Sequence, residues 1–322
     1  MLIFWIVVFL FSTVLLVKGA DWLLGSAEKI GLAIGLSPFI IGVVIVGLGT
    51  SFPELISSIV AVIKGVTEIV PANAIGSNIA NILLVVGLAA VIGGRLEVTK
   101  NLIDLDLPLL TITTVLFLGV SWDGKITFGE SLLLLSIFII YLIYTILYQG
   151  NKLKTAKKDV SRSKEKKKKR KKEKIETKDI IFLIIGIAGL VFGAKYLVES
   201  VVKLSEILNI GTGSITLVAV AVGTSLPELL VSVKAALNKK PEVALGNIFG
   251  SNVFNLVLVV GLPGLFKTLV LDEQTLRLGL PVMVFATLLF IISGISKRIH
   301  IYEGAMYIVI YILFVGKLFN LL

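Results

Sequence analysis

Two glutamates lie near the middle of long apolar segments of the sequence. Glu54 falls within an apolar stretch over residues 37–63, and Glu228 falls at the matching place within another over 211–236. A carboxylate at the centre of a lipid bilayer costs about 2.5–3.5 kcal/mol on insertion scales. Two such residues at matching positions therefore indicate a function. The alternative is a pair of protonated glutamates that only hold helices together.

A proline stands directly before each glutamate, Pro53 in the first segment and Pro227 in the second. A proline inside a helix has no N–H to donate, so it frees the carbonyl oxygen four residues earlier, here that of Gly49 or Gly223. The sequence therefore predicts two helices that are kinked or locally unwound beside the glutamates. Irregular backbone at membrane depth is tolerated where it is buried in protein or lines a cavity.

Hydroxyl and amide side chains recur around the two glutamates. A Thr–Ser pair precedes each glutamate by four and three residues, and in the next segment a serine and an asparagine four residues apart share one helix face. These residues are Thr50, Ser51, Ser77 and Asn81 in the first half and Thr224, Ser225, Ser251 and Asn255 in the second. Every candidate ligand is a hard oxygen, which suits Ca²⁺, Na⁺ or Mg²⁺ rather than zinc or copper.

The two segments belong to an internal repeat. Its offset is constant at 174 residues, the separation between Glu54 and Glu228 (228 − 54). Residues 49–55 read GTSFPEL and residues 223–229 read GTSLPEL, while residues 73–81 read NAIGSNIAN and residues 247–255 read NIFGSNVFN. Because no gap separates the two matches, chance does not explain them. With five helices in each copy, the second copy enters the membrane from the opposite side, which is the inverted topology typical of secondary transporters.

The composition identifies lipid as the solvent of this chain. Of its 322 residues, 56% are hydrophobic and 16% are charged, and the mean hydropathy is +1.00, whereas a soluble domain is about 25% charged. With no cysteine and one histidine, disulfide scaffolds, thiol catalysis and multi-histidine metal centres are excluded. The sequence shows no pairing of a nucleophile with a base, so we expect a protein that is not an enzyme and has no resident cofactor.

Ten apolar stretches are long enough to cross a bilayer, which takes about 20 helical residues each. They cover residues 2–24, 37–63, 69–93, 103–121, 128–148, 179–205, 211–236, 242–266, 275–294 and 301–320. The expected fold class is an all-α integral membrane protein with ten transmembrane helices in two inverted-topology five-helix repeats. The first repeat covers residues 1–149 (motif region 42–90), the linker 150–178 and the second repeat 179–322 (motif region 216–264).

The linker at residues 150–178 holds 15 lysines and arginines and four acidic residues. Basic loops stay on the cytoplasmic side of a membrane, so the linker is predicted to be cytoplasmic. With five helices on either side of it, both chain termini are then external, in a multi-pass protein of the cell membrane. The basic run is also suited to contact with anionic lipid headgroups. It has no interleaved aromatic residues, so no nucleic-acid partner is expected.

The repeated segments GTSxPEL and NxxGSNxxN resemble the two alpha-repeats of the cation/Ca²⁺ antiporter superfamily, in particular those of prokaryotic Na⁺/Ca²⁺ exchangers. The resemblance implies that Glu54 and Glu228 are the central cation ligands. It further implies backbone oxygens from Thr50, Thr224, Gly47 and Ala221, flanking sodium sites lined by Ser51, Ser225, Ser77 and Ser251, and amides of Asn81 and Asn255 that complete the middle. Asn255 stands where K⁺-dependent relatives carry Asp, which argues against K⁺ cotransport.

The resemblance predicts a secondary active antiporter that exchanges Ca²⁺ for Na⁺ across the cell membrane by alternating access and functions as a monomer. Two ionised glutamates give the site a charge of −2, which one Ca²⁺ or two Na⁺ neutralise. Two protons would do so equally, so an H⁺-coupled antiporter of Ca²⁺ or another divalent cation stays open as the alternative. A channel is disfavoured, because the repeat lies within one chain rather than in a ring of subunits.

Overall fold

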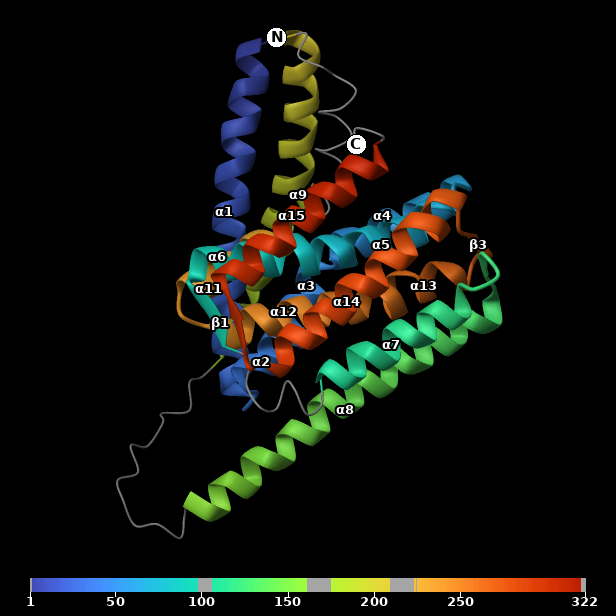
Figure 1. Ribbon diagram of the computed structural model, residues 1–322. Coiled ribbons are helices and arrows are strands. Elements are labelled where there is room, and N and C mark those ends of the chain that lie inside the picture. Colours follow the sequence, from blue (N-terminus) through green and yellow to red (C-terminus); the bar gives the residue numbers. More distant parts are fainter. Residues whose placement is uncertain (1, 98–105, 161–174, 209–222, 224, 320–322) are drawn as a thin grey trace.

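The computed structural model describes residues 2–97, 106–160, 175–208, 223 and 225–319. The described chain is mostly helical, with two short sheets of two strands each (Figure 1). Within these residues, eight helical segments are long and apolar enough to cross a membrane. They are Leu2–Ala33, Pro38–Lys64, Ile69–Gly93, Phe128–Thr145, Thr177–Leu204, Pro241–Gly264, Thr275–Ile295 and Ile301–Leu318. The chain is therefore a multi-pass membrane protein.

Several helices contain short π-helical segments, labelled η. The first half of the chain forms α1 (Leu2–Ala33), α2 (Pro38–Ile40), η1 (Ile41–Gly47), α3 (Leu48–Thr50), α4 (Phe52–Lys64), α5 (Ile69–Ile79), η2 (Ala80–Val86), α6 (Gly87–Gly93), β1 (Arg95–Glu97), α7 (Leu107–Val120), β2 (Lys125–Ile126) and α8 (Phe128–Val160). The second half forms α9 (Thr177–Leu208), α11 (Leu226–Leu237), α12 (Pro241–Phe254), η4 (Asn255–Val259), α13 (Gly261–Gly264), β3 (Leu269–Val270), η5 (Thr275–Gly279), α14 (Leu280–Ile295), β4 (Arg298–His300) and α15 (Ile301–Leu318).

Two of the ten predicted spans are not among the eight long segments. The span predicted at 103–121 contains the shorter apolar helix α7. The span predicted at 211–236 lies partly outside the described residues, and its described end forms α11. The mostly helical membrane fold is confirmed, and the count of ten helices stays a prediction. Helix α8 runs beyond residue 149, so the chain that follows the first predicted repeat starts as a helix.

Helix α1 is longer than its predicted span at 2–24, because the helix ends only at a glycine in the left-handed conformation. Gly35 has a φ of +87°, which glycine adopts without strain. Around it, the N–H of Leu36 donates to the carbonyl of Gly31 at 2.8 Å, and the N–H of Gly35 donates to the carbonyl of Leu32 at 3.1 Å. This Schellman motif closes the helix.

Helices α1 and α9 lie side by side and stand together at one end of the molecule (Figure 1). A Cβ added to Gly19 would lie 2.9 Å from the backbone nitrogen of Leu190, and one added to Gly193 would lie 2.9 Å from the backbone nitrogen of Leu16. The glycines let the two backbones approach closely, as small residues do between membrane helices. The two contacts are equivalent under the repeat, because Gly193 is the repeat counterpart of Gly19 and Leu190 is that of Leu16.

Ion pairs tie the C-terminal half of α1 to the second half of the chain. Asp21 pairs with Lys234 of α11, and Glu28 pairs with Lys240, the residue before α12. All four side chains are partly exposed, and pairs of this kind contribute about 0.2–1 kcal/mol each. They fix which helices α1 faces at this end more than they add to stability.

Helix α12 is buried along nearly its whole length and meets η1 backbone to backbone. A Cβ added to Gly250 would lie 2.5 Å from the carbonyl oxygen of Val43, so a side chain there would push the two helices apart. The close contact brings Gly47, at the end of η1, next to Ser251 of α12.

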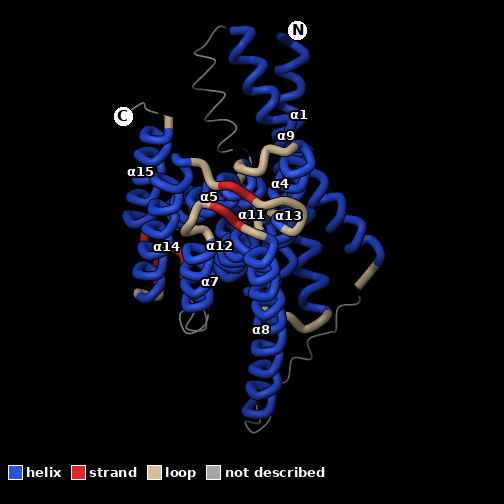
Figure 2. The backbone as a smooth tube through the Cα atoms, turned by 90° about the vertical axis from the view of Figure 1, so that its right-hand side faces the viewer, coloured by secondary structure: helices blue, strands red, loops and turns tan. Residues whose placement is uncertain are grey.

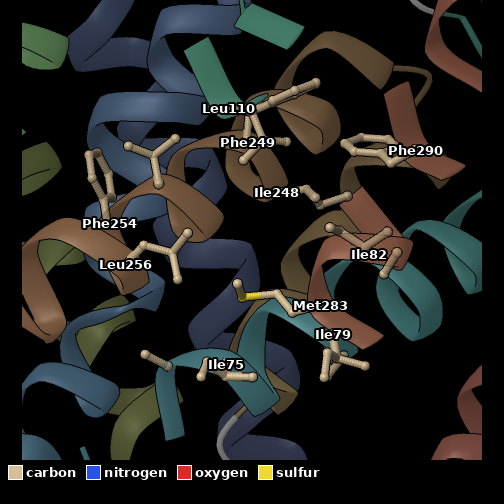
Figure 3. Close-up of a cluster of buried hydrophobic side chains, with 14 of the residues drawn as sticks. Ile75, Ile79, Ile82, Leu110, Ile248, Phe249, Phe254, Leu256, Met283 and Phe290 are labelled. Atoms are coloured by element: carbon tan, nitrogen blue, oxygen red, sulfur yellow. The ribbon is translucent and has the colours of Figure 1, made fainter. Parts of the chain in front are cut away.

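Apolar side chains from both halves pack into one core around these central helices (Figure 3). Phe249 of α12 packs on Phe290 of α14, with 5.0 Å between the ring centroids. Ile79 and Met283 are fully buried in the same cluster. Because lipid tails are as apolar as these side chains, close packing rather than removal from water holds such helices together.

Each short sheet joins a strand of the first half to a strand of the second (Figure 2). Strands β1 and β4 pair antiparallel with Arg95 opposite His300, and strands β2 and β3 pair antiparallel with Ile126 opposite Leu269. Adding the repeat offset to position 95 gives 269, and adding it to position 126 gives 300. The β1–β4 pair and the β2–β3 pair are therefore equivalent under the repeat. The offset found in the sequence is thus repeated in the sheet register.

Gly19→Val is expected to destabilise the protein, because its side chain would collide with the backbone of α9. Overpacking of this kind costs about 1–3 kcal/mol. Thermal unfolding of the purified protein in detergent measures the effect as a lower melting temperature. Gly25→Val is the control, since Gly25 lies in the same helix and has nothing within 4 Å of an added Cβ. An equal loss in both variants would contradict the packing argument.

Candidate cation-binding site

The first glutamate helix is interrupted at a serine, and the described part of the second glutamate helix begins after the equivalent serine. Helix α3 gives way to α4 at Ser51, whose φ and ψ are −82° and 2°, and α11 begins after Ser225, at −91° and 6°. Pro53 and Pro227 lie in the first turn of the helices that follow, where a missing N–H is harmless. The interruption expected beside Pro53 is present, and Ser225 has nearly the same backbone conformation as Ser51. Of the residues that precede Ser225, positions 209–222 and 224 lie outside the described part of the chain, so the second interruption stays a prediction.

The breaks place each glutamate in the first turn of a helix. Glu54 lies in the first turn of α4 and Glu228 in that of α11, and both residues are 0% exposed. The partial positive charge of a helix N-terminus stabilises a carboxylate by about 0.3–1 kcal/mol. Burying an ionised carboxylate away from water costs much more. The helix termini alone therefore do not compensate two buried charges.

The two glutamates belong to one site. The carboxyl groups of Glu54 and Glu228 are close enough to interact electrostatically. Ser51, from the first helix break, donates its hydroxyl to Oε1 of Glu228 at 3.5 Å, so the first half of the chain contacts the acid of the second. Two like charges in a medium of low dielectric constant repel each other strongly. A cation between them would turn that repulsion into attraction.

Many polar atoms around the glutamates are buried and have no hydrogen-bond partner. These atoms are Oε1 and Oε2 of Glu54, Oε2 of Glu228, Oγ of Ser77, Oγ of Ser225, Oδ1 and Nδ2 of Asn81, and Oδ1 of Asn255. Folded proteins leave few buried polar groups unpaired. Nearly all of these atoms are oxygens, the ligands that hard cations require. Across the described residues there is no cluster of three or more His, Cys, Asp and Glu, so neutral oxygens would complete the coordination.

Asn247 of α12 connects the two halves around the site, although the sequence did not single it out as a site residue. Its Oδ1 accepts a hydrogen bond from Oγ1 of Thr50 at 3.0 Å. Its Nδ2 donates to Oγ of Ser232 at 2.8 Å and to the carbonyl oxygen of Glu228 at 3.4 Å. The signal that could have identified it is its place in the repeated motif, where it matches Asn73.

A second asparagine, Asn78, crosses between the halves. Its Nδ2 donates to the carbonyl oxygen of Asn252 at 3.0 Å, and its Oδ1 accepts from Nδ2 of Asn255 at 3.1 Å. The bond fixes the amide of Asn255 with its nitrogen engaged, which leaves the Oδ1 atom unpaired. Asn78 therefore orients a candidate ligand without being one itself.

The carbonyl of Gly47 lies among the polar side chains of both halves. It accepts from Oγ1 of Thr50 at 3.3 Å and from Oγ of Ser251 at 3.5 Å. The other described candidates, Ser77, Asn81 and Ser225, are buried on the α5–η2 segment and at the start of α11, which contact each other and their neighbours α4 and α12. Two predicted ligands, Thr224 and Ala221, lie outside the described residues, so their roles stay predictions.

Three of the predicted ligands lie at the ends of π-helical segments. Gly47 ends η1, Asn81 is the second residue of η2, and Asn255 begins η4. A π-turn inserts one extra residue into a helix and re-aims the side chains beside it, and such turns are frequent at functional sites. Hydrophobic periodicity carries no signal for these segments, so they could not be predicted from the sequence.

The fold and its oxygen-lined centre define a class of membrane transporter. A family model described as sodium/calcium exchanger protein matches residues 4–147 and 178–319. Because the match covers most of the chain, the chain belongs to the sodium/calcium exchanger family, a family of transporters rather than enzymes. The predicted resemblance to the cation/Ca²⁺ antiporter superfamily is confirmed.

Individual relatives are similar over almost the whole chain. The sodium/calcium exchanger MaX1 of Methanosarcina acetivorans is 34% identical, with 97% of each chain covered. The putative antiporter CaxA of Alkalimonas amylolytica is 32% identical, again with 97% of each chain covered. A solved structure of the sodium-calcium exchanger NCX_Mj, soaked with 10 mM Na⁺ and zero Ca²⁺, matches with a TM-score of 0.82 at 30% identity, covering 98% of this chain and 99% of that one.

We expect Ca²⁺ to raise the melting temperature of the purified protein and Glu228→Gln to remove that effect. A ligand at 100 times its Kd stabilises the folded state by about 2.7 kcal/mol, and glutamine keeps the side-chain volume but not the charge. Thermal unfolding with and without Ca²⁺ measures this. Glu206→Gln, at an exposed residue paired with Lys203, should keep the Ca²⁺ effect. A Ca²⁺ effect that survives Glu228→Gln would refute the site.

Proposed function

We propose that the chain is a secondary active antiporter that exchanges Ca²⁺ for Na⁺ across the cell membrane by alternating access. The observation that carries this proposal is the pair of fully buried carboxylates, Glu54 and Glu228, with unpaired oxygens at the contact between the two halves. The relatives support it. One is named a sodium/calcium exchanger, and NCX_Mj was studied with both Na⁺ and Ca²⁺.

Charge neutrality gives a physical reason for exchange rather than leak. The ionised pair carries a charge of −2, and moving it through a medium of low dielectric constant is strongly unfavourable while it is uncompensated. One Ca²⁺ or two Na⁺ neutralise the pair, so the protein reorients readily when loaded and slowly when empty. A third Na⁺, held by hydroxyl and carbonyl oxygens, would make each cycle electrogenic.

The carboxylate oxygens and the neutral oxygens of the site bind different ions. The carboxylates of Glu54 and Glu228 hold Ca²⁺ at the centre, where charge matters most. The neutral ligands that surround them are Thr50, Ser51, Ser77, Asn81 and Gly47 from the first half and Thr224, Ser225, Ser251, Asn255 and Ala221 from the second. Among these, the serines line the flanking Na⁺ sites, since Na⁺ accepts neutral oxygens more readily than a divalent ion does.

An inverted repeat of two five-helix halves would support alternating access. The strand pairs and the glycine contacts of α1 and α9, both related by the repeat offset, support this architecture. In such a carrier α1 and α9 move against the helices that bear the glutamates. The basic linker then lies in the cytoplasm near anionic lipid, and both termini are external. Because one chain supplies both glutamates, it functions as a monomer.

The central test is ⁴⁵Ca²⁺ uptake into liposomes that contain the full-length protein. An outward Na⁺ gradient should drive uptake, and Glu54→Gln and Glu228→Gln should each reduce it to the level of empty liposomes, because either change halves the charge that holds Ca²⁺. Glu206→Gln serves as the matched control and should transport normally. Uptake like that of the wild type in either site variant would sink the assignment.

Proton coupling is the alternative, and the relative named a putative antiporter is compatible with it, since that name specifies no coupling ion. It is tested in the same liposomes with a pH gradient and no Na⁺. Uptake driven by the pH gradient alone would identify H⁺ rather than Na⁺ as the coupling ion. Uptake that needs Na⁺ and stays unaffected by the pH gradient would retain the Na⁺/Ca²⁺ exchange.

A further inference from the structure

The two halves hold the same asparagine–serine pair in two different states. In the second half, Nδ2 of Asn247 on α12 donates to Oγ of Ser232 on α11 at 2.8 Å. The repeat offset leads from these two residues to Asn73 on α5 and Ser58 on α4, which are of the same types. There, Nδ2 of Asn73 and Oγ of Ser58 are both buried without a hydrogen-bond partner. One bond is made and its counterpart is not.

The types of the two paired residues do not explain the difference, since Asn73 and Asn247 are both asparagine and Ser58 and Ser232 are both serine. A buried donor or acceptor without a partner is unfavourable, and in the first half both Nδ2 of Asn73 and Oγ of Ser58 are in that state. The open pair therefore reflects a difference in how closely the two helix pairs, α4 with α5 and α11 with α12, are brought together around the site.

A cavity lies beside the open pair. It has a volume of about 590 Å³, and its lining includes Asn73, the candidate ligand Ser77 and, near η5, Asp272. Although partial burial disfavours its charge, hydrogen bonds from Thr275 hold the pKa of Asp272 below its usual range. The rest of the lining is mostly apolar, with Tyr311 and Phe314 among it, so the cavity places one carboxylate and the edge of the candidate site around the same space.

The closed pair is buried, as Ser58 is in the other half, and it is connected to Glu228. Ser232 and Asn247 are each 0% exposed. Asn247 also donates to the carbonyl oxygen of Glu228 and accepts from Thr50. The same amide therefore closes the α11–α12 contact and holds the first turn of the helix that carries Glu228. A change in the hydrogen bond of this pair would therefore alter the positions of Glu228 and Thr50.

We propose that the two asparagine–serine pairs are alternating locks of the transport cycle. Each pair, when bonded, closes the route to the site through its own half, and the two bonds form in turn. The pair Asn247–Ser232 is closed in this structure and the pair Asn73–Ser58 is open. The inference rests on the proposed antiport, and it assigns these four residues a positioning role rather than a ligand role.

The fixed charges of α1 lie on the closed side. Lys234, two residues beyond Ser232 on α11, forms the ion pair with Asp21. The equivalent position in the first half is Val60, which cannot form an ion pair. The chain is therefore built to favour the state in which the second pair is bonded, so the two locks are of unequal strength.

The absence of cysteine from the chain makes single cysteines clean reporters of the two routes. Ile69→Cys and Val243→Cys stand at equivalent positions of the repeat. Ile69 lines the larger cavity and is 47% exposed, whereas Val243 is 3% exposed and lines a smaller pocket of about 130 Å³ beside α1. The rates at which a water-soluble maleimide labels these two cysteines, in the full-length protein in detergent, measure the opening of each half.

Ser232→Ala removes the closed lock, so it should speed the labelling of Val243→Cys by about 2- to 10-fold, the range that corresponds to one hydrogen bond, and slow the labelling of Ile69→Cys. Ser58→Ala should do the opposite, because it weakens the state in which the first pair is bonded. Ser136→Ala, at an exposed serine of α8, is the control and should leave both rates unchanged.

Unchanged rates in both variants, or shifts in the same direction, would overturn the locks. A merely structural serine would lower the melting temperature without moving the two reporters in opposite directions. Labelling requires no transport, so the two proposals fail separately. Opposite shifts without Na⁺-driven uptake would refute the antiport alone, whereas uptake without opposite shifts would refute the locks alone.

Discussion

Two acidic side chains, Glu54 and Glu228, are fully buried in the helix bundle. The features around them reduce the electrostatic cost of burying two negative charges close together. Each acid lies at a helix start, because α4 begins after Ser51 and α11 begins after Ser225. Each also needs oxygens that are not already engaged. Because one acid comes from each half of the chain, neither half can hold the site alone, and the halves must fit together backbone to backbone around it.

The asparagines explain how the ring of oxygens stays in place while its members remain unpaired. The side chains of Asn78 and Asn247 form hydrogen bonds with other protein groups. Asn81 makes none, and Asn255 leaves its oxygen free. Residues of one type thus serve as scaffold at two positions and as candidate ligands at two others. Buried polar networks are rigid when fully satisfied, so a satisfied outer layer can support an unsatisfied inner one.

Much of this could be predicted from the sequence, because the signals are local or repeated. Composition indicated lipid, proline placed the helix breaks beside Glu54 and Glu228, and the constant offset paired the two motifs. Features that depend on how helices meet could not be predicted. The role of Asn247 depends on a residue 197 positions away, and the π-turns follow no hydrophobic period. Asn73 and Asn247 occupy the same position of the repeated motif but differ in bonding, which the motif alone does not predict.

The two sheets carry a consequence for biosynthesis. Strands β1 and β2 belong to the part of the chain that leaves the ribosome first, yet they pair with β4 and β3, which are made near its end. An unpaired strand edge is a template for association with other chains. The early helices can therefore enter the membrane as translation proceeds, but the strands at their ends stay unpaired until β3 and β4 have been synthesised. A chain cut before residue 269 would lack β3 and β4 and leave both edges open to misassembly, whereas one cut between 271 and 297 would leave only β1 unpaired.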